Sequence, residues 1–213
     1  MSQELLTQNI VLVTENLNTA IFTEYWFIKN GIIREDEIIQ PSIFVPGFVK
    51  IETNDWRIEI TAQFIQFVLK TDDISKSNTC IKQVLSKMVS HFLSLGIRAI
   101  GFNFTWLVSD AQDIAAKTIE LFGNGGSPVY DQFMTGDSEL GAIFKKQYNQ
   151  STLLNLTIKT AEVENEGKRK KILTSSFNYH RSIQGESATS QIEDQLKNWN
   201  QIRQNAQKIS CLI

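Results

Sequence analysis

The sequence predicts an α+β protein in which two pseudo-repeated β-α-βββ-α halves form one long twisted antiparallel sheet with helices on one side. Three observations support this fold class. Several segments alternate apolar and polar residues at a period of two, which is typical of strands with one open face. Other segments place apolar residues at helical spacing. The order of segments occurs twice, and a glycine follows the first helix of each half, at Gly31 and Gly123.

The first half opens with a β-branched run at residues 9–15, which predicts a strand. A helix is expected at residues 19–30, with Asn18 as its N-cap. This helix carries more aromatic side chains than one buried face requires, which suggests a contact with a partner protein; the residues concerned are Tyr25, Trp26 and Phe27. The acidic segment 34–37 and the proline-containing segment 41–47 are expected to form a loop and an edge of the sheet.

Residues 48–69 predict a meander of three short strands. Asn54-Asp55 suits a two-residue hairpin turn because both side chains tolerate a positive φ, and a change of alternation predicts a second turn near Ala62-Gln63. The clearest helix of the chain follows. Its expected cap is Ser77 or Asn78, and its expected end is Gly96.

The second half begins with the strand 97–108, in which Phe102, Phe104 and Trp106 share one face. A helix at residues 110–122 comes next. The remaining strands are expected at 140–148, 152–163 and 171–181, and a final helix at 189–209. The chain is therefore expected to be a single domain, residues 1–213, made of the pseudo-repeats 9–96 and 97–209.

The order β-α-βββ-α resembles half of the duplicated saddle of TATA-binding-protein-like folds, a similarity of fold that does not carry function with it. A second resemblance is to a sporadically distributed family of prokaryotic proteins. It rests on W-R-I-E-I-T-A-Q-F-I-Q-F, on the central strand with Arg98 and Gly101, and on L-K-N-W-N-Q-I-R-Q-N-A in the last helix. Phe102, Phe104 and Thr105 depart from the family's choices in that strand. The resemblance implies an association with defence or mobile-element genes and no particular activity.

The composition argues against several classes of protein. The formal net charge is -2 and the pI is near 5.8, so no global charge attracts nucleic acid or acidic membranes. We expect no membrane helix, since no run approaches about 18 apolar residues, and the N-terminus lacks the pattern of a secretory signal. Cys80 and Cys211 lie far apart, which predicts no disulfide and a cytoplasmic setting.

A search for reactive groups finds no recognisable catalytic or cofactor motif. Two histidines, His91 and His180, and two distant cysteines give no zinc spacing. The glycines at 123, 125 and 126 follow a helix and precede a proline, unlike the phosphate-binding loops that open a helix. We therefore expect no metal and no cofactor, and an enzyme is disfavoured.

The only basic cluster is Lys168, Arg169, Lys170 and Lys171. One interpretation is a solvated hairpin tip, because Glu162, Glu164 and Glu166 balance its charge. The other is a finger that contacts nucleic-acid phosphate, which gives only weak and salt-sensitive binding when contacts are few.

The open face of the second half-sheet gives the candidate binding site. If the aromatic residues of the strand 97–108 face the helices, one surface of amides and hydroxyls faces away. The candidate residues are Asn103, Thr105, Asn155, Thr157, Lys159, Asn178 and His180. Such a surface suits a polar ligand, a peptide or a nucleic-acid backbone, and it is also what a solvated sheet face looks like. A register slip of one residue would invert the assignment.

The sequence leads to three functional hypotheses. The first is a non-enzymatic binding or assembly module that engages a protein partner or a second copy through the open face, a sheet edge or the helical layer. The second is nucleic-acid recognition through the sheet and the basic cluster. The third is a receptor for a small polar ligand, or an enzyme, which requires Asn103, Asn155, Asn178 and His180 to converge on a cavity.

Overall fold

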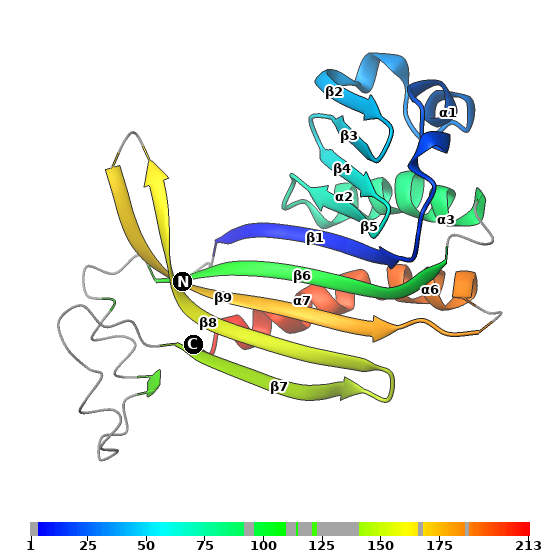
Figure 1. Cartoon of the computed structure of the whole chain (residues 1–213). Helices are drawn as coiled ribbons and strands as arrows, with labels where there is room; N and C mark the ends of the chain where they lie inside the picture. The colour runs from blue at the N-terminus through cyan, green and yellow to red at the C-terminus, as the bar shows by residue number, and fades with distance from the viewer. Residues whose placement is uncertain are drawn as a thin grey trace.

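The described part of the chain folds around one antiparallel sheet of nine strands in the order β2-β3-β4-β5-β1-β6-β9-β8-β7 (Figure 1). The computed structural model describes residues 4–91, 96–109, 114, 121–122, 141–165, 168–185 and 188–213. Its strands are β1 (Leu5–Thr14), β2 (Ile39–Val45), β3 (Phe48–Glu52), β4 (Trp56–Thr61), β5 (Phe64–Leu69), β6 (Ile97–Ser109), β7 (Ala142–Asn149), β8 (Thr152–Asn165) and β9 (Lys168–Ser182). The expected α+β class with one long antiparallel sheet is confirmed.

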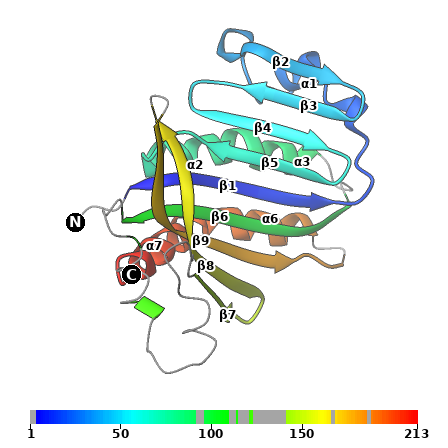
Figure 2. The same cartoon turned by 60° about the vertical axis from the view of Figure 1, so that its left-hand side comes forward.

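The helices α2, α3, α6 and α7 lie on one face of this sheet, as Figures 1 and 2 show. The helical segments are 3-10 turns at Thr19–Ile21 and Glu35–Glu37, α1 (Glu24–Lys29), α2 (Ile74–Ile81), a π-helical turn at Lys82–Ser86, α3 (Lys87–His91), α6 (Ala188–Lys197) and α7 (Trp199–Ser210). We call the opposite side of the sheet its open face. In Figure 1 the central strands are seen from that side, with no helix in front of them.

The two longest-range neighbours, β1 and β6, form the centre of the sheet. Their registered pairs include Ile10↔Phe102 and Leu12↔Ile100, and all four side chains are fully buried on the helical face or nearly so. The apolar phase of the strand 97–108 is therefore the predicted one, with Phe102, Phe104 and Trp106 in the core. The alternate residues lie on the open face as expected.

The predicted meander is confirmed over β3, β4 and β5. The Thr53 hydroxyl accepts hydrogen bonds from the backbone N–H groups of Asp55 and Trp56, at 3.3 and 3.0 Å, and closes the first turn. The Thr61 hydroxyl closes the second by accepting from the N–H of Gln63 and Phe64. Both turns depend on a threonine at the preceding strand end, which satisfies backbone donors that the sheet leaves free.

Three helical predictions are corrected. The segment 19–30 is a 3-10 turn capped by Asn18 followed by α1, whose cap is Thr23. The helix after the meander begins earlier than predicted, because Asp73 rather than Ser77 or Asn78 caps it. The expected final helix is two helices, α6 and α7, separated at Asn198.

Other predictions on element boundaries have different outcomes. In the region where a loop and an edge were expected, residues 39–45 form the edge strand β2. Gly31 and Gly96 have φ values of +60° and +58°, the left-handed conformation expected of glycines that follow helices. The helix predicted at 110–122 lies largely outside the described residues, as do Gly123 and the glycine-rich loop.

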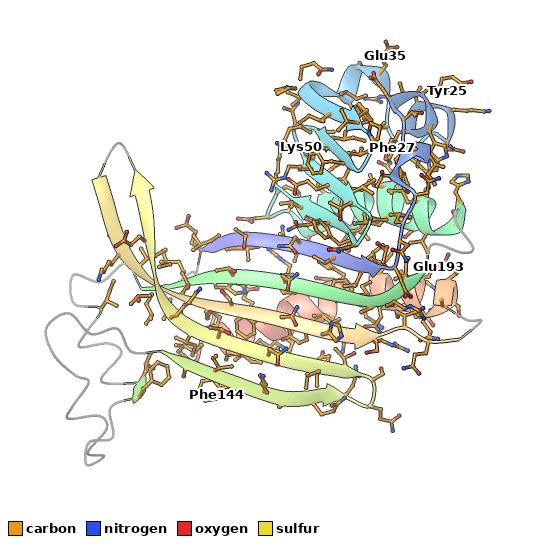
Figure 3. All side chains as sticks on the ribbon, viewed as in Figure 1. Tyr25, Phe27, Glu35, Lys50, Phe144 and Glu193 are labelled. Atoms are coloured by element: carbon orange, nitrogen blue, oxygen red, sulfur yellow. The ribbon has the colours of Figure 1, made fainter. Side chains whose placement is uncertain are left out.

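The aromatic residues of the first helix do not form the exposed cluster that the sequence suggested. Phe27 is fully buried, and Trp26 makes edge contacts with the rings of Phe22 at 5.4 Å and His91 at 6.3 Å. Only Tyr25 extends into solvent, with 70% of its surface exposed, and Figure 3 shows the two labelled side chains Tyr25 and Phe27 on either side of α1. The helical period of α1 explains this difference, because Tyr25 and Phe27 are two residues apart and therefore lie about 200° apart around the helix axis.

Membrane-spanning helices and clusters of metal-binding side chains are both absent from the described residues. None of the helices there has both the length and the apolar character needed to span a lipid bilayer. No group of three or more His, Cys, Asp or Glu side chains within the described ranges is arranged to hold a metal ion.

Candidate functional site

Four asparagines form a row across four neighbouring strands of the open face. Strand register places Asn9 opposite Asn103, Asn103 opposite Asn178, and Asn178 opposite Asn155. Each amide nitrogen donates to the next amide oxygen: Asn103 to Asn9 at 2.8 Å, Asn178 to Asn103 at 2.7 Å, and Asn155 to Asn178 at 3.3 Å. The row is therefore a continuous chain of side-chain hydrogen bonds that runs from β8 to β1.

A second row, of hydroxyl groups, lies beside the asparagines. Thr7, Thr105, Ser176 and Thr157 are registered opposite one another on β1, β6, β9 and β8. The Thr105 and Ser176 hydroxyl oxygens are 3.1 Å apart and share a hydrogen bond. We call the eight residues of the two rows the polar lattice. Apart from the exposed Thr7, their side chains are half-buried.

The lattice is held in place by the apolar face beneath it. On β9, Phe177 and Tyr179 flank Asn178 in sequence and point to the helices, where both are buried. The Tyr179 hydroxyl donates to Asn205 of α7 at 2.7 Å, and burial raises the pKa of that hydroxyl. These contacts fix the orientation of β9 about its own axis and so keep Asn178 on the open face.

The lattice itself is uncharged, and charges occur only around it. Lys145 on β7 is registered opposite Asn155 at one end of the amide row, and Val68 lies opposite Asn9 at the other. The oxygen Oδ1 of Asn155 is buried and has no hydrogen-bond partner. The chain of amides thus ends in an unused acceptor next to the edge strand.

All seven predicted site residues lie on the open face, but they divide into two groups. Five of them belong to the lattice: Asn103, Thr105, Asn155, Thr157 and Asn178. The other two flank it on opposite sides. His180 is registered opposite Gly101, beyond the amide row, and Lys159 is opposite Thr174, beyond the hydroxyl row.

The sequence reasoning missed the β1 contribution, Thr7 and Asn9. A signal was present, since residues 5–14 alternate in the same way as the strand 97–108. The sequence does not show that β1 pairs directly with β6, because paired residues such as Asn9 and Asn103 lie more than ninety residues apart in the chain. The hydrogen bond between these two side chains shows this pairing.

The basic cluster lies at the far end of the β8–β9 hairpin, whose tip projects beyond the rest of the sheet in Figures 1 and 2. Register places Lys171 opposite Glu162 and Arg169 opposite Glu164. Opposite charges at directly paired positions, such as those of Lys171 and Glu162, stabilise a sheet. Lys168 is registered opposite Asn165, and Lys170 opposite Val163, so half of the basic residues lie opposite a carboxylate.

Two cavities formed by described residues do not include the asparagine row, although Thr7 of the hydroxyl row lines one of them. A groove of about 600 Å³ runs between α2 with its π-helical turn and α6 with α7, and Ile81, Leu196 and Asn200 are among its lining residues. Another, of about 530 Å³, lies at the end of β1 and β5 next to Lys76. Asn103, Asn155, Asn178 and His180 line neither cavity. The three asparagines belong to the surface row and His180 lies beside it, so the four residues do not converge on these cavities.

Comparison of the chain with protein-family models and with curated proteins finds no match to either.

Proposed function

We propose that this protein is a non-enzymatic binding module that engages an extended segment of a partner protein on the open face of its sheet. The observation that carries the proposal is the uncharged polar lattice on the four neighbouring strands β1, β6, β9 and β8. Among the described residues, no helix lies over the polar lattice (Figure 1).

A polypeptide suits this chemistry because its backbone offers donors and acceptors at regular intervals and carries no charge. An asparagine side chain supplies both an acceptor oxygen and two N–H donors, and a hydroxyl supplies one donor and two acceptor positions. The hydrogen bonds between the amides also fix their orientation before a partner arrives. A preorganised surface of this kind loses less side-chain entropy on binding than a set of free side chains.

Two observations favour a protein partner over nucleic acid. Phosphate recognition relies on lysine and arginine, and neither occurs in the lattice. In the basic cluster, Lys171 is registered opposite Glu162, and this carboxylate weakens the positive field that a phosphate would meet. A receptor for a small ligand, or an enzyme, is favoured less, because the predicted polar residues form a flat row.

We also infer that the fold arose from two copies of one pattern, with β1 and β6 as equivalent strands. In the strand order, β1 is followed outward by β5 and β6 by β9, and each half ends in a helical segment on the same face, α2 with α3 and α6 with α7. The equivalent strands meet at the centre of the sheet, where Asn9 and Asn103 pair. On this reading the lattice is built across the boundary between the copies.

Site-specific photocrosslinking in cells that produce the protein tests the proposed function. A benzophenone amino acid is introduced at Thr157 in the lattice and, as a control, at the exposed Gln204 on α7. We expect a discrete protein adduct from position 157 and none from position 204. The purified partner should then bind about tenfold more weakly to Asn103→Ala, which interrupts the amide row. Equal adducts from both positions, or crosslinked nucleic acid at position 157, would contradict the proposal.

A further inference from the structure

The two edge strands of the sheet differ in how open they are to another strand. At one edge, β2 contains Pro41, which has no N–H to donate, and its pairing with β3 shifts register between Ile39 and Ile43. At the other edge, β7 pairs regularly with β8 from Ala142 to Gln147, and no proline interrupts it. No described strand pairs with the outer side of β7. Natural proteins usually block such an edge, as β2 is blocked.

The side chains of β7 are unusually apolar for an exposed edge. Ile143 on the open face is 68% exposed, and Phe144 on the helical face is 50% exposed. Phe144 does have one aromatic neighbour, Phe122, at 6.5 Å between ring centroids, yet half of its surface remains free. Figure 3 shows the labelled Phe144 at the outer margin of the sheet. Large apolar side chains on both faces of an unpaired strand are typical of a surface that another strand covers.

The charges of β7 indicate what kind of strand fits. Lys145 and Lys146 follow the two apolar residues, both are exposed, and neither forms an ion pair with a residue of the described part of the chain. Antiparallel pairing of two copies of β7 about the strand centre would bring these lysines close to the same lysines of the second copy. Like charges at directly opposed positions destabilise a sheet, so the edge disfavours its own copy and favours carboxylates.

We propose that β7 binds an extended acidic segment of a partner protein as a tenth, antiparallel strand. Every strand pair of the sheet is antiparallel, and the same geometry at this edge fixes the order of the partner's residues. Read from its N-terminal end, the segment places two acidic residues opposite Lys146 and Lys145 and then two apolar residues opposite Phe144 and Ile143. Backbone hydrogen bonds supply affinity, and the charges supply selectivity. This inference does not depend on the role proposed for the open face.

Fluorescence anisotropy with synthetic peptides tests the inference. The probe is a short labelled peptide with Glu-Glu-Val-Val at its centre, and the comparison peptides carry the reversed order Val-Val-Glu-Glu and the basic version Lys-Lys-Val-Val. We expect the full-length protein to bind the probe about tenfold more tightly than either comparison peptide. Hydrogen exchange of the complex should show added protection on the amides of β7 and not on those of β2.

Charge reversal provides the matched control. The double variant Lys145→Glu/Lys146→Glu should lose about tenfold in affinity for the probe and should now prefer the Lys-Lys-Val-Val peptide. The variant Lys82→Glu/Lys208→Glu has the same net charge, with both changes at exposed helical positions, and should bind the probe like the parent protein. Equal affinity for the three peptides, equal effects of the two double variants, or protection located away from β7 would each overturn the inference. These peptide titrations involve no open-face partner, so their failure leaves the proposed function standing, and the reverse also holds.

Discussion

At the scale of single residues, the amide row has an internal order that can be measured. Asn103 both donates to Asn9 and accepts from Asn178, so it has a neighbour on each side. Asn155 takes part in one such bond, and its oxygen is left without a partner. A side-chain hydrogen bond makes a net contribution of about 1 kcal/mol to the free energy of folding. Residues in the middle of the row should therefore stabilise the fold more than the residue at its end.

A double-mutant cycle on Asn103 and Asn178 checks this arrangement. We expect Asn103→Ala to lower the free energy of unfolding by about 1–2 kcal/mol and Asn155→Ala by less. The cycle should give a coupling energy of about 1 kcal/mol, because the two amides share a bond of 2.7 Å. Urea denaturation is the measurement. The exposed Gln204→Ala serves as control and should stay within about 0.5 kcal/mol of the parent; additive single effects would show that the row is not coupled.

The position of Arg203 in the core could not be predicted from the amino-acid sequence alone. It is only 6% exposed, and its guanidinium carbon lies 5.8 Å from the ring centroids of both Trp106 and Trp199. It donates to the backbone carbonyl of Asp72 at 3.2 Å, and burial lowers its pKa. Arg203 on α7 thus contacts both β6 and the segment that follows the meander. From the sequence, it was one polar residue among others in an amphipathic helix.

Replacement of Arg203 should show that stacking, and not charge alone, is what stabilises this contact. We expect Arg203→Ala to lower the free energy of unfolding by about 3 kcal/mol, since two cation–π contacts and one charged hydrogen bond are lost. Arg203→Lys should recover only part of this loss, because the compact, strongly hydrated ammonium group is a poorer partner for two aromatic rings than the planar guanidinium. Chemical denaturation of both variants decides the matter, and a lysine variant as stable as the parent would contradict the stacking argument.

At the scale of elements, strands were predicted better than helix ends. A period of two is a direct consequence of strand geometry, so β3, β4, β5 and β6 were placed within a residue or two. Helix starts were less well determined, because T-D-D-I-S-K-S-N offers several residues able to cap. The choice among them depends on where β5 ends, at Leu69, and on how soon the chain can turn beneath the sheet, which local sequence does not record.

The cap of α2 can be tested by comparing Asp73 with the residue that the sequence suggested. The Asp73 carboxylate accepts from the backbone N–H of Lys76 at 3.0 Å, whereas Asn78 is exposed within the helix. We expect Asp73→Ala to lower the free energy of unfolding by about 1 kcal/mol. Asn78→Ala should have little effect or a slightly stabilising one, because alanine favours the helix interior. Thermal melts followed by circular dichroism will distinguish the two, and a larger loss for Asn78→Ala would move the cap to the predicted place.

At the scale of the whole molecule, the open face could be predicted, but its extent could not. The alternation in 97–108 identified the polar side of β6, and the same phase in β8 and β9 located five lattice residues. The partnership of β1 with β6, which adds Thr7 and Asn9, is a contact between distant parts of the chain and leaves no local trace. The edge position of β7 could not be predicted either, because the strand order of the complete sheet determines which strands are edges.

The continuity of the sheet across β1 and β6 predicts that the two parts of the chain unfold together. The buried residues form one hydrophobic cluster that contains side chains from both sides of this pair. The four tryptophans report on both parts: Trp26 and Trp56 lie before β6, and Trp106 and Trp199 lie in β6 and α7. We expect the variants Trp26→Phe/Trp56→Phe and Trp106→Phe/Trp199→Phe each to show a fluorescence midpoint in urea that coincides with the circular dichroism midpoint of the same variant. Each variant is compared with itself, so any loss of stability from the substitutions cancels. If the fluorescence and circular dichroism midpoints differ in either variant, the part of the chain before β6 and the part from β6 onward unfold independently.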